Sequence, residues 1–133
     1  MNNKSIFGLF VARDGKVNYP GLIIDGSKTI ETRPGSRNVL KKLIGERVAI
    51  IDTSIKPAQV IGYVTIYGSL FCPSRFFGEF RTETLIPAGS KYDDKGGGKY
   101  MYYLANAEKC SPYPVPTNKV NHGRSYCEFN IPA

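Results

Sequence analysis

The feature that most constrains the fold is an uninterrupted strand-like run over residues 60–71. Successive side chains of a β-strand point to opposite faces, and neither face of this run is polar. One face would carry Val60, Gly62, Val64, Ile66 and Gly68, and the other Ile61, Tyr63, Thr65 and Tyr67. A strand that is apolar on both faces lies in the centre of a sheet or curls around a barrel. Gly62 and Gly68 would allow the bending that closure of a barrel requires.

Shorter strands are predicted on both sides of this run, separated by turns. Their ranges are residues 5–12, 29–33, 47–53, 100–107 and 125–131. The chain of 133 residues contains 14 glycines, 9 prolines, 9 tyrosines and 7 phenylalanines, which favours short strands and turns over long helices. The proline-containing residues 111–124 are predicted to be extended or looped.

Two or three short helices complete the predicted elements. Asn18 or Tyr19 would cap the first helix, and Pro20 suits its first turn because the missing N–H has no intrahelical partner there. Gly26 would end this helix in a left-handed conformation. Two further helices are predicted over residues 39–44 and 73–81.

These elements indicate the fold class. Strands do not alternate with long helices, which argues against a doubly wound parallel sheet. The prediction is a mainly β (α+β) protein: a single domain over residues 1–133, built as a small, partly open β-barrel of about six strands with two or three short helices.

No apolar run approaches the roughly 18 residues that a membrane span needs. The apolar residues 5–12 are predicted to form a strand rather than a signal peptide, because no small-residue cleavage site accompanies them. A cytoplasmic protein that does not bind membranes is therefore expected, with a monomer favoured.

The formal net charge is +7, from 18 Lys and Arg against 11 Asp and Glu. Seven basic and three acidic side chains fall within residues 28–56. A positive field in one region attracts polyanions such as nucleic acid and speeds their arrival. The alternative is a solvated surface that only keeps the protein soluble.

Cysteines, the single histidine and a pair of adjacent acids are the other candidates for chemistry. Cys72, Cys110 and Cys127 are far apart and odd in number, against a disulfide framework. A nucleophilic pair of His122 with one of them is conceivable, but Cys127 lies in a predicted strand and is typical of a core residue. The adjacent acids Asp93-Asp94 lack a third ligand at regular spacing, so no metal site is expected. No cofactor is predicted.

Residues 88–99 are polar and rich in glycine, which predicts a mobile loop. Its end, Lys95-Gly96-Gly97-Gly98-Lys99, lacks the Gly-Lys-Ser/Thr ending of a phosphate-binding loop. A flexible lid or tether is therefore predicted here.

Residues 26–33, Gly-Ser-Lys-Thr-Ile-Glu-Thr-Arg, suggest a binding site. Strand alternation places Glu31 and Arg33 on one face, where they can pair. Lys28 lies at the junction of loop and strand, and its long side chain can turn toward both. Arg33 can grip a phosphate or carboxylate bidentately, Lys28 adds a mobile charge, and Glu31 can orient either cation or accept a base amino group. The alternative is a solvated pair that stabilises the fold by only a fraction of a kcal/mol, on the order of 0.5.

Tyr19 is the aromatic residue most expected to face a ligand, because it opens the helix that leads into Gly26. The other tyrosines and phenylalanines either provide a surface for base stacking or fill the core of the barrel.

The pattern Gly26-x-Lys28-x-x-Glu31-x-Arg33, after an N-terminal strand and a short helix, resembles the signature of the ASCH domain family. These small domains have a fold similar to the RNA-binding PUA domain. The resemblance covers residues 5–71 well and the remainder loosely. It implies a PUA-like β-barrel with a cleft whose floor includes the motif residues, and it implies RNA or nucleotide-like ligands.

Some members of this family are small amidohydrolases that remove an acyl group from the exocyclic amine of N4-acetylcytidine. Their proposed catalytic set is the motif lysine, a threonine three residues later and a downstream glutamate. Lys28 matches the lysine, Glu31 stands at the threonine position, and Thr29 and Thr32 lie beside it. The downstream carboxylate would come from Glu79 or Glu83.

The sequence thus predicts an RNA- or nucleotide-binding domain with a basic cleft formed by Lys28, Glu31, Arg33 and Tyr19. The alternative is a small amidohydrolase acting on modified nucleosides or RNA, with Lys28, Thr29 and Glu31 as catalytic residues. A carboxylate facing Lys28 would keep it protonated, which suits anion binding better than base catalysis.

Overall fold

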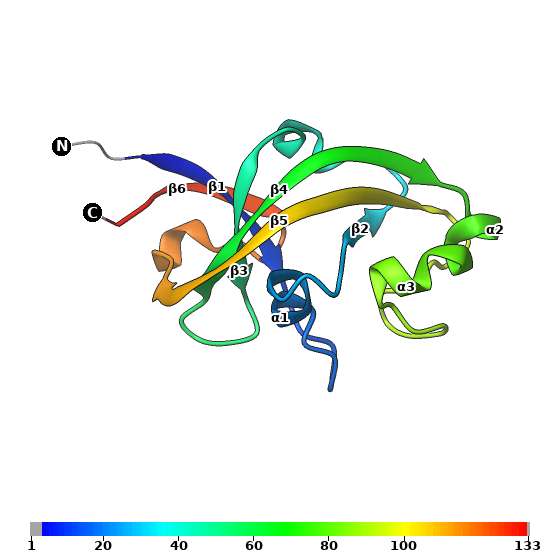
Figure 1. The fold of residues 1–133 in the computed structure, drawn as a ribbon, viewed down its shortest axis with the longest axis horizontal. Helices are drawn as coiled ribbons and strands as arrows, with labels where there is room; N and C mark the ends of the chain where they lie inside the picture. Colours follow the sequence, from blue (N-terminus) through cyan, green and yellow to red (C-terminus); the bar gives the residue numbers. More distant parts are fainter. Residues whose placement is uncertain (1–3, 133) are drawn as a thin grey trace.

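Six strands form one sheet in the order β2-β5-β4-β3-β1-β6 (Figure 1). The computed structural model describes residues 4–132. The strands are β1 (Ser5–Val11), β2 (Ile30–Pro34), β3 (Arg47–Asp52), β4 (Gln59–Cys72), β5 (Lys99–Pro114) and β6 (Tyr126–Asn130). Neighbouring strands are antiparallel except β1 and β3, which are parallel. The predicted mainly β fold with few short helices is confirmed.

The long strands β4 and β5 pair along most of their length and form the centre of the sheet. β4 includes the whole predicted run, and its residues Val60, Val64 and Ile66 are fully buried. β5 is longer than the predicted 100–107, because β4 continues to pair with it as far as Pro114. β2 pairs only with the first five residues of β5, so the later part of β5 is an edge that tolerates prolines.

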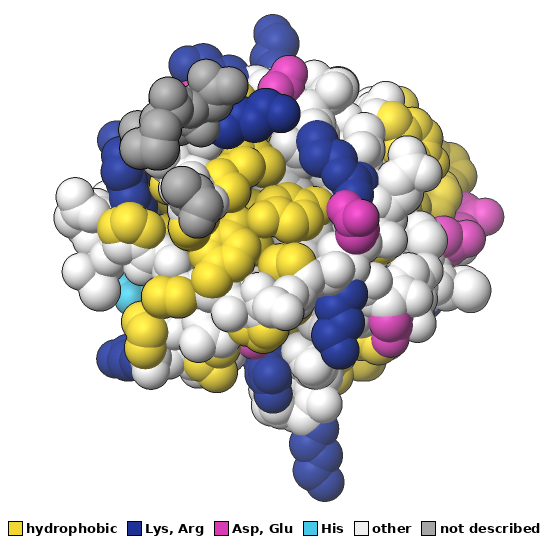
Figure 2. Space-filling model, turned by 60° about the vertical axis from the view of Figure 1, so that its left-hand side comes forward, with side chains coloured by type: hydrophobic (Ala, Val, Ile, Leu, Met, Phe, Trp, Pro, Cys, Tyr) yellow, Lys and Arg dark blue, Asp and Glu magenta, His cyan; other side chains and the backbone are white. Residues whose placement is uncertain are grey.

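Side chains on the two faces of the sheet form two hydrophobic clusters. In β3, Val48 and Ile50 belong to the larger cluster, whereas Ala49 belongs to the smaller one. Helix α1 (Tyr19–Ile24) packs on the larger cluster and buries Tyr19 and Ile23 in it. Figure 2 shows that hydrophobic side chains also reach the surface near the chain termini, with Lys and Arg side chains around them.

Helix α1 begins and ends as predicted. The side chain of Asn18 accepts a hydrogen bond from the Gly21 N–H at 3.1 Å, and Pro20 occupies the first turn. Gly26 follows the helix with φ of +85°, in the left-handed region that favours glycine.

The other helices are shorter than predicted. The expected helix over residues 39–44 is a single 3₁₀ turn, η1 (Lys41–Leu43), because Leu40 and Leu43, three residues apart, both enter the core. The expected helix over residues 73–81 is divided, and Gly78 lies where the first part ends. The remaining helices are α2 (Ser74–Phe77), η2 (Gly78–Phe80), α3 (Arg81–Thr84) and η3 (Thr117–Lys119). None of the helices within residues 4–132 is long and apolar enough to cross a membrane.

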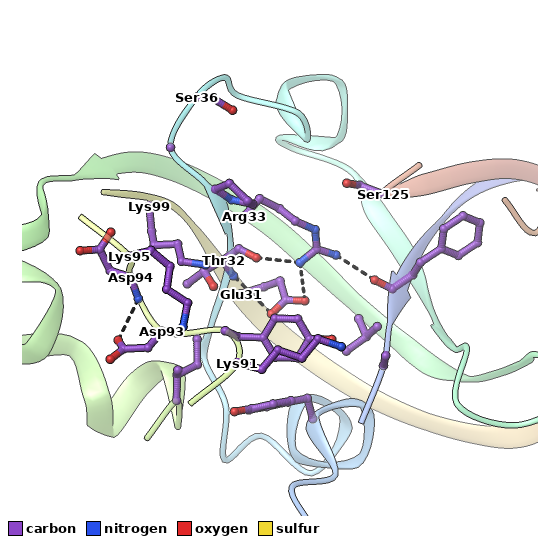
Figure 3. Close-up of a pocket in the computed structure, with 18 of the residues that line it drawn as sticks. Glu31, Thr32, Arg33, Ser36, Lys91, Asp93, Asp94, Lys95, Lys99 and Ser125 are labelled. Carbon is purple, nitrogen blue, oxygen red and sulfur yellow. Dashed lines mark hydrogen bonds and ion pairs between the residues drawn. The ribbon is translucent and has the colours of Figure 1, made fainter. Parts of the chain in front are cut away.

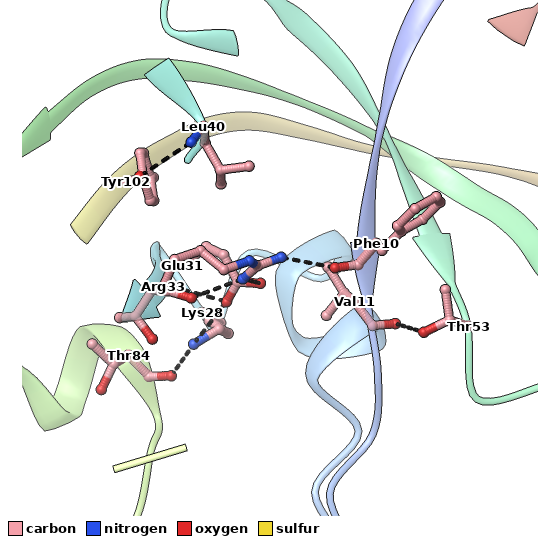
Figure 4. A network of polar contacts seen from close by, with 10 residues as sticks. Phe10, Val11, Lys28, Glu31, Arg33, Leu40, Thr53, Thr84 and Tyr102 are labelled. Carbon is pink, nitrogen blue, oxygen red and sulfur yellow. Dashed lines mark hydrogen bonds and ion pairs between the residues drawn. The ribbon is translucent and has the colours of Figure 1, made fainter. Parts of the chain in front are cut away.

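The sheet curls until its edge strand β2 approaches β1, which is not its neighbour in the sheet (Figure 4). The contact is made by a side chain, because Nη2 of Arg33 on β2 donates to the carbonyl oxygen of Phe10 on β1 at 2.8 Å. The barrel is thus closed at this point by Arg33 rather than by strand pairing. Of the 26–33 motif, Lys28 and Glu31 are buried, whereas Gly26, Ser27 and Thr29 are exposed.

Candidate functional site

Three ionisable side chains of the motif meet beside β2 (Figure 4). Nζ of Lys28 lies 3.6 Å from Oε1 of Glu31, and Nη1 of Arg33 lies 2.8 Å from Oε2 of the same carboxylate. The side chain of Lys28 is 1% exposed, that of Glu31 8% and that of Arg33 16%. The predicted gathering of the three groups is therefore observed, and they do not form a solvated surface pair.

The chain before β2 explains which residues reach this position. β2 begins only at Ile30, so strand alternation does not govern Lys28 and Thr29. Lys28 turns inward and donates to the carbonyl oxygen of Thr84, whereas Thr29 is exposed and its N–H donates to the carbonyl oxygen of Glu83.

Burial and charge oppose each other at this site. Burial by itself would raise the pKa of Glu31, but the Arg33 guanidinium, the Lys28 ammonium and hydrogen bonds from Arg33 and the Thr32 N–H outweigh it and lower that pKa. At Lys28 burial prevails over the attraction of Glu31, and the pKa of Lys28 is lowered. The surrounding groups therefore favour the ionised form of Glu31. At Lys28, burial disfavours the charged form, and the carboxylate of Glu31 offsets only part of this cost.

Arg33 uses much of its donor capacity within the protein. Nη1 donates to Glu31 and to the carbonyl oxygen of Thr32, at 2.8 and 2.7 Å, and Nη2 donates to Phe10. A guanidinium has five N–H donors, so Nε and one N–H of Nη2 have no hydrogen-bond partner among residues 4–132.

A cavity of about 700 Å³ opens beside these residues (Figure 3). Six cationic side chains line it: Lys28, Arg33, Lys91, Lys95, Lys99 and Arg124. Three carboxylates, Glu31, Asp93 and Asp94, oppose them. The predicted basic segment 28–56 supplies only two of the six cations, and the remaining four come from the second half of the chain.

The glycine-rich residues 88–98 form one wall of the cavity. Asp93 accepts from the Gly89 N–H at 2.8 Å and pairs with Arg81 at 3.1 Å, and Asp94 accepts from the Gly98 N–H at 2.7 Å. The carboxylates that the sequence left as a solvated pair therefore fix the shape of this loop. Within residues 4–132 no group of three or more His, Cys, Asp or Glu side chains is arranged to hold a metal ion.

Tyr19 lines the cavity but is almost completely buried. Its ring centroid lies 5.0 Å from Nζ of Lys28 and 5.9 Å from the ring of Tyr92, which it meets edge to face. Tyr19 is only 3% exposed, and its hydroxyl has no hydrogen-bond partner among the described residues. An aromatic ring with an unused donor thus adjoins the cationic group.

Comparison with known proteins identifies the fold. No family model and no curated protein matches the sequence. Solved structures of the ASCH protein of Zymomonas mobilis do match: the unmutated protein has a TM-score of 0.62 at 15% identity, covering 81% of this chain and 73% of that one. The chain has the ASCH fold.

Solved structures of two single-residue variants of the same Zymomonas mobilis protein also match this chain. One has a TM-score of 0.64 at 14% identity, over 81% of this chain and 76% of that chain. The other has a TM-score of 0.65 at 16% identity, over 94% of this chain and 88% of that chain. The resemblance inferred from the 26–33 motif is confirmed at the level of the fold.

Within this ASCH fold, four predicted site residues line the cavity together: Lys28, Glu31, Arg33 and Tyr19. Thr29 does not line it, and Thr32 does. Neither Glu79 nor Glu83 lies in the cavity wall, and Glu79 is exposed on η2. His122 lines the cavity, but the three cysteines do not, so no Cys-His pair forms there.

Gly98 holds the end of the cavity loop against the ASCH sheet, and we expect Gly98→Ala to destabilise the protein by about 1–3 kcal/mol. Its φ is +77°, and a Cβ would lie 2.8 Å from the carbonyl oxygen of Cys72. Gly89 has the same φ but nothing within 4 Å of a Cβ, so Gly89→Ala is the matched control. Thermal unfolding should show the larger loss for Gly98→Ala. Equal losses would contradict the steric argument.

Proposed function

We propose that the protein binds a nucleotide, free or as part of an RNA strand, in the cavity beside Lys28, Glu31 and Arg33. The observation that supports this most is the lining, where six cationic side chains outnumber three carboxylates next to the ring of Tyr19. A nucleotide combines an anionic phosphate with a flat base, which are the two chemistries that such a lining accommodates. The volume of about 700 Å³ lies within the roughly 300–1,000 Å³ typical of ligand pockets.

The four predicted ligand-binding residues have different roles in this proposal. Lys28 has three N–H donors; one donates to Thr84 and Glu31 lies 3.6 Å from Nζ, so at least one has no partner among residues 4–132 and can bind the ligand. Arg33 closes the barrel and offers its remaining donors to the anionic part. Glu31 fixes both cations. The ring of Tyr19, nearly buried against Lys28 and Tyr92, contacts the base only through the small part that lines the cavity.

The test is equilibrium binding of a fluorescently labelled single-stranded RNA of about ten nucleotides, measured at several salt concentrations. We expect the affinity to fall with salt, because each phosphate contact on a single strand contributes about 0.7 to the slope of log K against log salt. Lys91 and Lys95 are exposed at the cavity, so replacing both by Gln should lower affinity and slope without unfolding the protein. Arg33→Ala should lower the affinity further.

Lys109 provides a matched control, since it is exposed on β5 and does not line the cavity. Lys109→Gln should bind as the wild type does. The proposal would be contradicted by an absence of RNA and nucleotide binding at low salt, or by equal losses for Lys109→Gln and the cavity variants.

One observation favours hydrolysis as a second candidate function. Burial lowers the pKa of Lys28, which moves this amine toward the neutral form that a general base requires. Lys28 would then take a proton from a water molecule whose oxygen attacks the acyl carbon, and the C–N bond breaks so that the exocyclic amine leaves with the proton and the acyl group leaves as the carboxylate. Alternatively, the amine of Lys28 attacks the acyl carbon itself, and water then hydrolyses the acyl-lysine. Thr32 in the cavity would replace Thr29, and Glu31 lies 3.6 Å from Nζ of Lys28. Glu31 opposes this role, because its charge favours the ammonium.

Hydrolysis is tested by incubating the protein with N4-acetylcytidine and a panel of acylated nucleosides, and by following release of cytidine and acetate. Activity that disappears in Lys28→Met would support it. Activity that is unchanged in Lys28→Met would exclude Lys28 as base or nucleophile.

A further inference from the structure

Lys99 is a cation that the sequence did not mark as a site residue. It opens β5, where it pairs in register with Pro34 of β2 and Cys72 of β4, one position beyond the Arg33–Tyr100 pair. Only 8% of the residue is exposed, and it lines the cavity. Figure 3 shows its side chain on the same side of the cavity as Thr32, next to the Glu31–Arg33 pair.

The ammonium of Lys99 has no partner within residues 4–132: no hydrogen bond or ion pair of its Nζ is found there. The sealed polar side-chain atoms without a partner in this part of the chain are Tyr19 Oη and Glu83 Oε1. Nζ of Lys99 is not among these sealed atoms, so it keeps some solvent-accessible surface. We take this surface to face the cavity, because Lys99 lines it. Lys28 differs, since Thr84 and Glu31 engage it.

The neighbouring carboxylates do not pair with the ammonium of Lys99. Oδ1 of Asp94 accepts from the N–H of Gly98 at 2.7 Å, and Glu31 is shared by Lys28 and Arg33. The pKa of Lys99 is lowered by burial, although Asp94 opposes the change. Lys99 is thus a mostly buried residue whose ammonium faces the cavity without a protein partner, and an anion in the cavity would supply a charge-assisted hydrogen bond to it.

We propose that Lys99 binds the phosphate group of the ligand, so that the cavity selects phosphorylated nucleotides over nucleosides. This inference rests on the proposed nucleotide binding and names the residue that binds the phosphate. A charge-assisted hydrogen bond contributes about 1.5–3 kcal/mol, which corresponds to a preference of at least tenfold.

Calorimetric titration with uridine, uridine 5′-monophosphate and the dinucleotide UpU tests the proposal. The monophosphate carries a phosphate monoester and UpU a diester, so the two arms distinguish a free nucleotide from an RNA strand. We expect wild-type protein to bind at least one of the two about tenfold or more tightly than uridine. Lys99→Met should remove this preference, so that uridine and the two phosphorylated ligands bind with similar affinity.

Lys109→Met, on the same strand but outside the cavity, is the matched control and should keep the preference. Lys99→Arg retains the charge and should also keep it. Lys99→Gln removes the charge and should lose the preference, so it decides the matter if Lys99→Met does not fold. A preference that persists in Lys99→Met, or a wild type that binds uridine and both phosphorylated ligands equally, overturns the role of Lys99 and leaves nucleoside binding standing. Absence of binding by all three overturns the proposed function as well.

Discussion

Replacing Glu31 by alanine is expected to lower the free energy of unfolding by about 3–5 kcal/mol. The reason is that Glu31 is the carboxylate shared by Lys28 and Arg33, whose side chains are 1% and 16% exposed. Without it two poorly solvated cations lie next to each other. Removal of one partner from a buried ionic group is costly because the remaining charge cannot be solvated.

Urea unfolding at pH 7 measures this loss, and Glu108→Ala supplies the comparison. Glu108 pairs with Arg47 at 3.2 Å, but its side chain is 70% exposed. Pairs of this kind contribute about 0–1 kcal/mol. Losses of the same size for Glu31→Ala and Glu108→Ala would show that the carboxylate beside β2 does not hold the cations as described.

In contrast to Glu31→Ala, Lys28→Met is expected to have a large effect on nucleotide binding and a small effect on stability. Glu31 keeps its 2.8 Å pair with Arg33 in this variant, and methionine fills the buried volume of the lysine. We therefore expect the free energy of unfolding to stay within about 1 kcal/mol of the wild type. Nucleotide affinity should fall at least about tenfold, because a charge-assisted hydrogen bond is lost.

The pH dependence of stability tests whether the buried charge of Lys28 costs stability in the wild type. The pKa of Lys28 is lowered by burial from its ordinary value of 10.5, so the unfolded chain binds its proton more tightly than the folded protein does. At pH values below the folded pKa the charge is buried at full cost, and the cost disappears as the pH rises toward 10.5. Wild type should therefore gain stability relative to Lys28→Met on raising the pH. The comparison is made below pH 10, the ordinary pKa of tyrosine, so that Tyr19, whose pKa is raised by burial and whose ring lies beside Lys28, stays protonated. A gap that is constant with pH would contradict the lowered pKa.

The sequence predicted the parts of the site that depend on local spacing. Glu31 and Arg33 are two residues apart in a strand, so their pairing follows from the pleat alone. Tyr19 was found because Asn18, Pro20 and Gly26 mark a short helix that ends next to the motif. Thr29 was misplaced because β2 begins one residue later than predicted, and alternation does not apply before Ile30.

The rest of the site depends on contacts between distant segments. Lys99 reaches the cavity because β5 pairs with Pro34, and residues 91–95 reach it because Asp93 and Asp94 fix the loop through backbone hydrogen bonds. Nothing in a polar, glycine-rich stretch indicates which segment it will pack against. The sequence showed that the chain is basic, but it did not show that the cations from its two halves converge.

The convergence of these cations on one nucleotide-binding cavity is tested most directly by NMR titration of the isotopically labelled protein with uridine 5′-monophosphate. The backbone amides of residues 28–36 and 91–99, which hold most of the cavity wall, should shift together and saturate with a single dissociation constant. Amides on the opposite face of the sheet, around Ala49 and Ile51, should stay in place. Shifts confined to that face, or no shifts at millimolar nucleotide, would contradict the account.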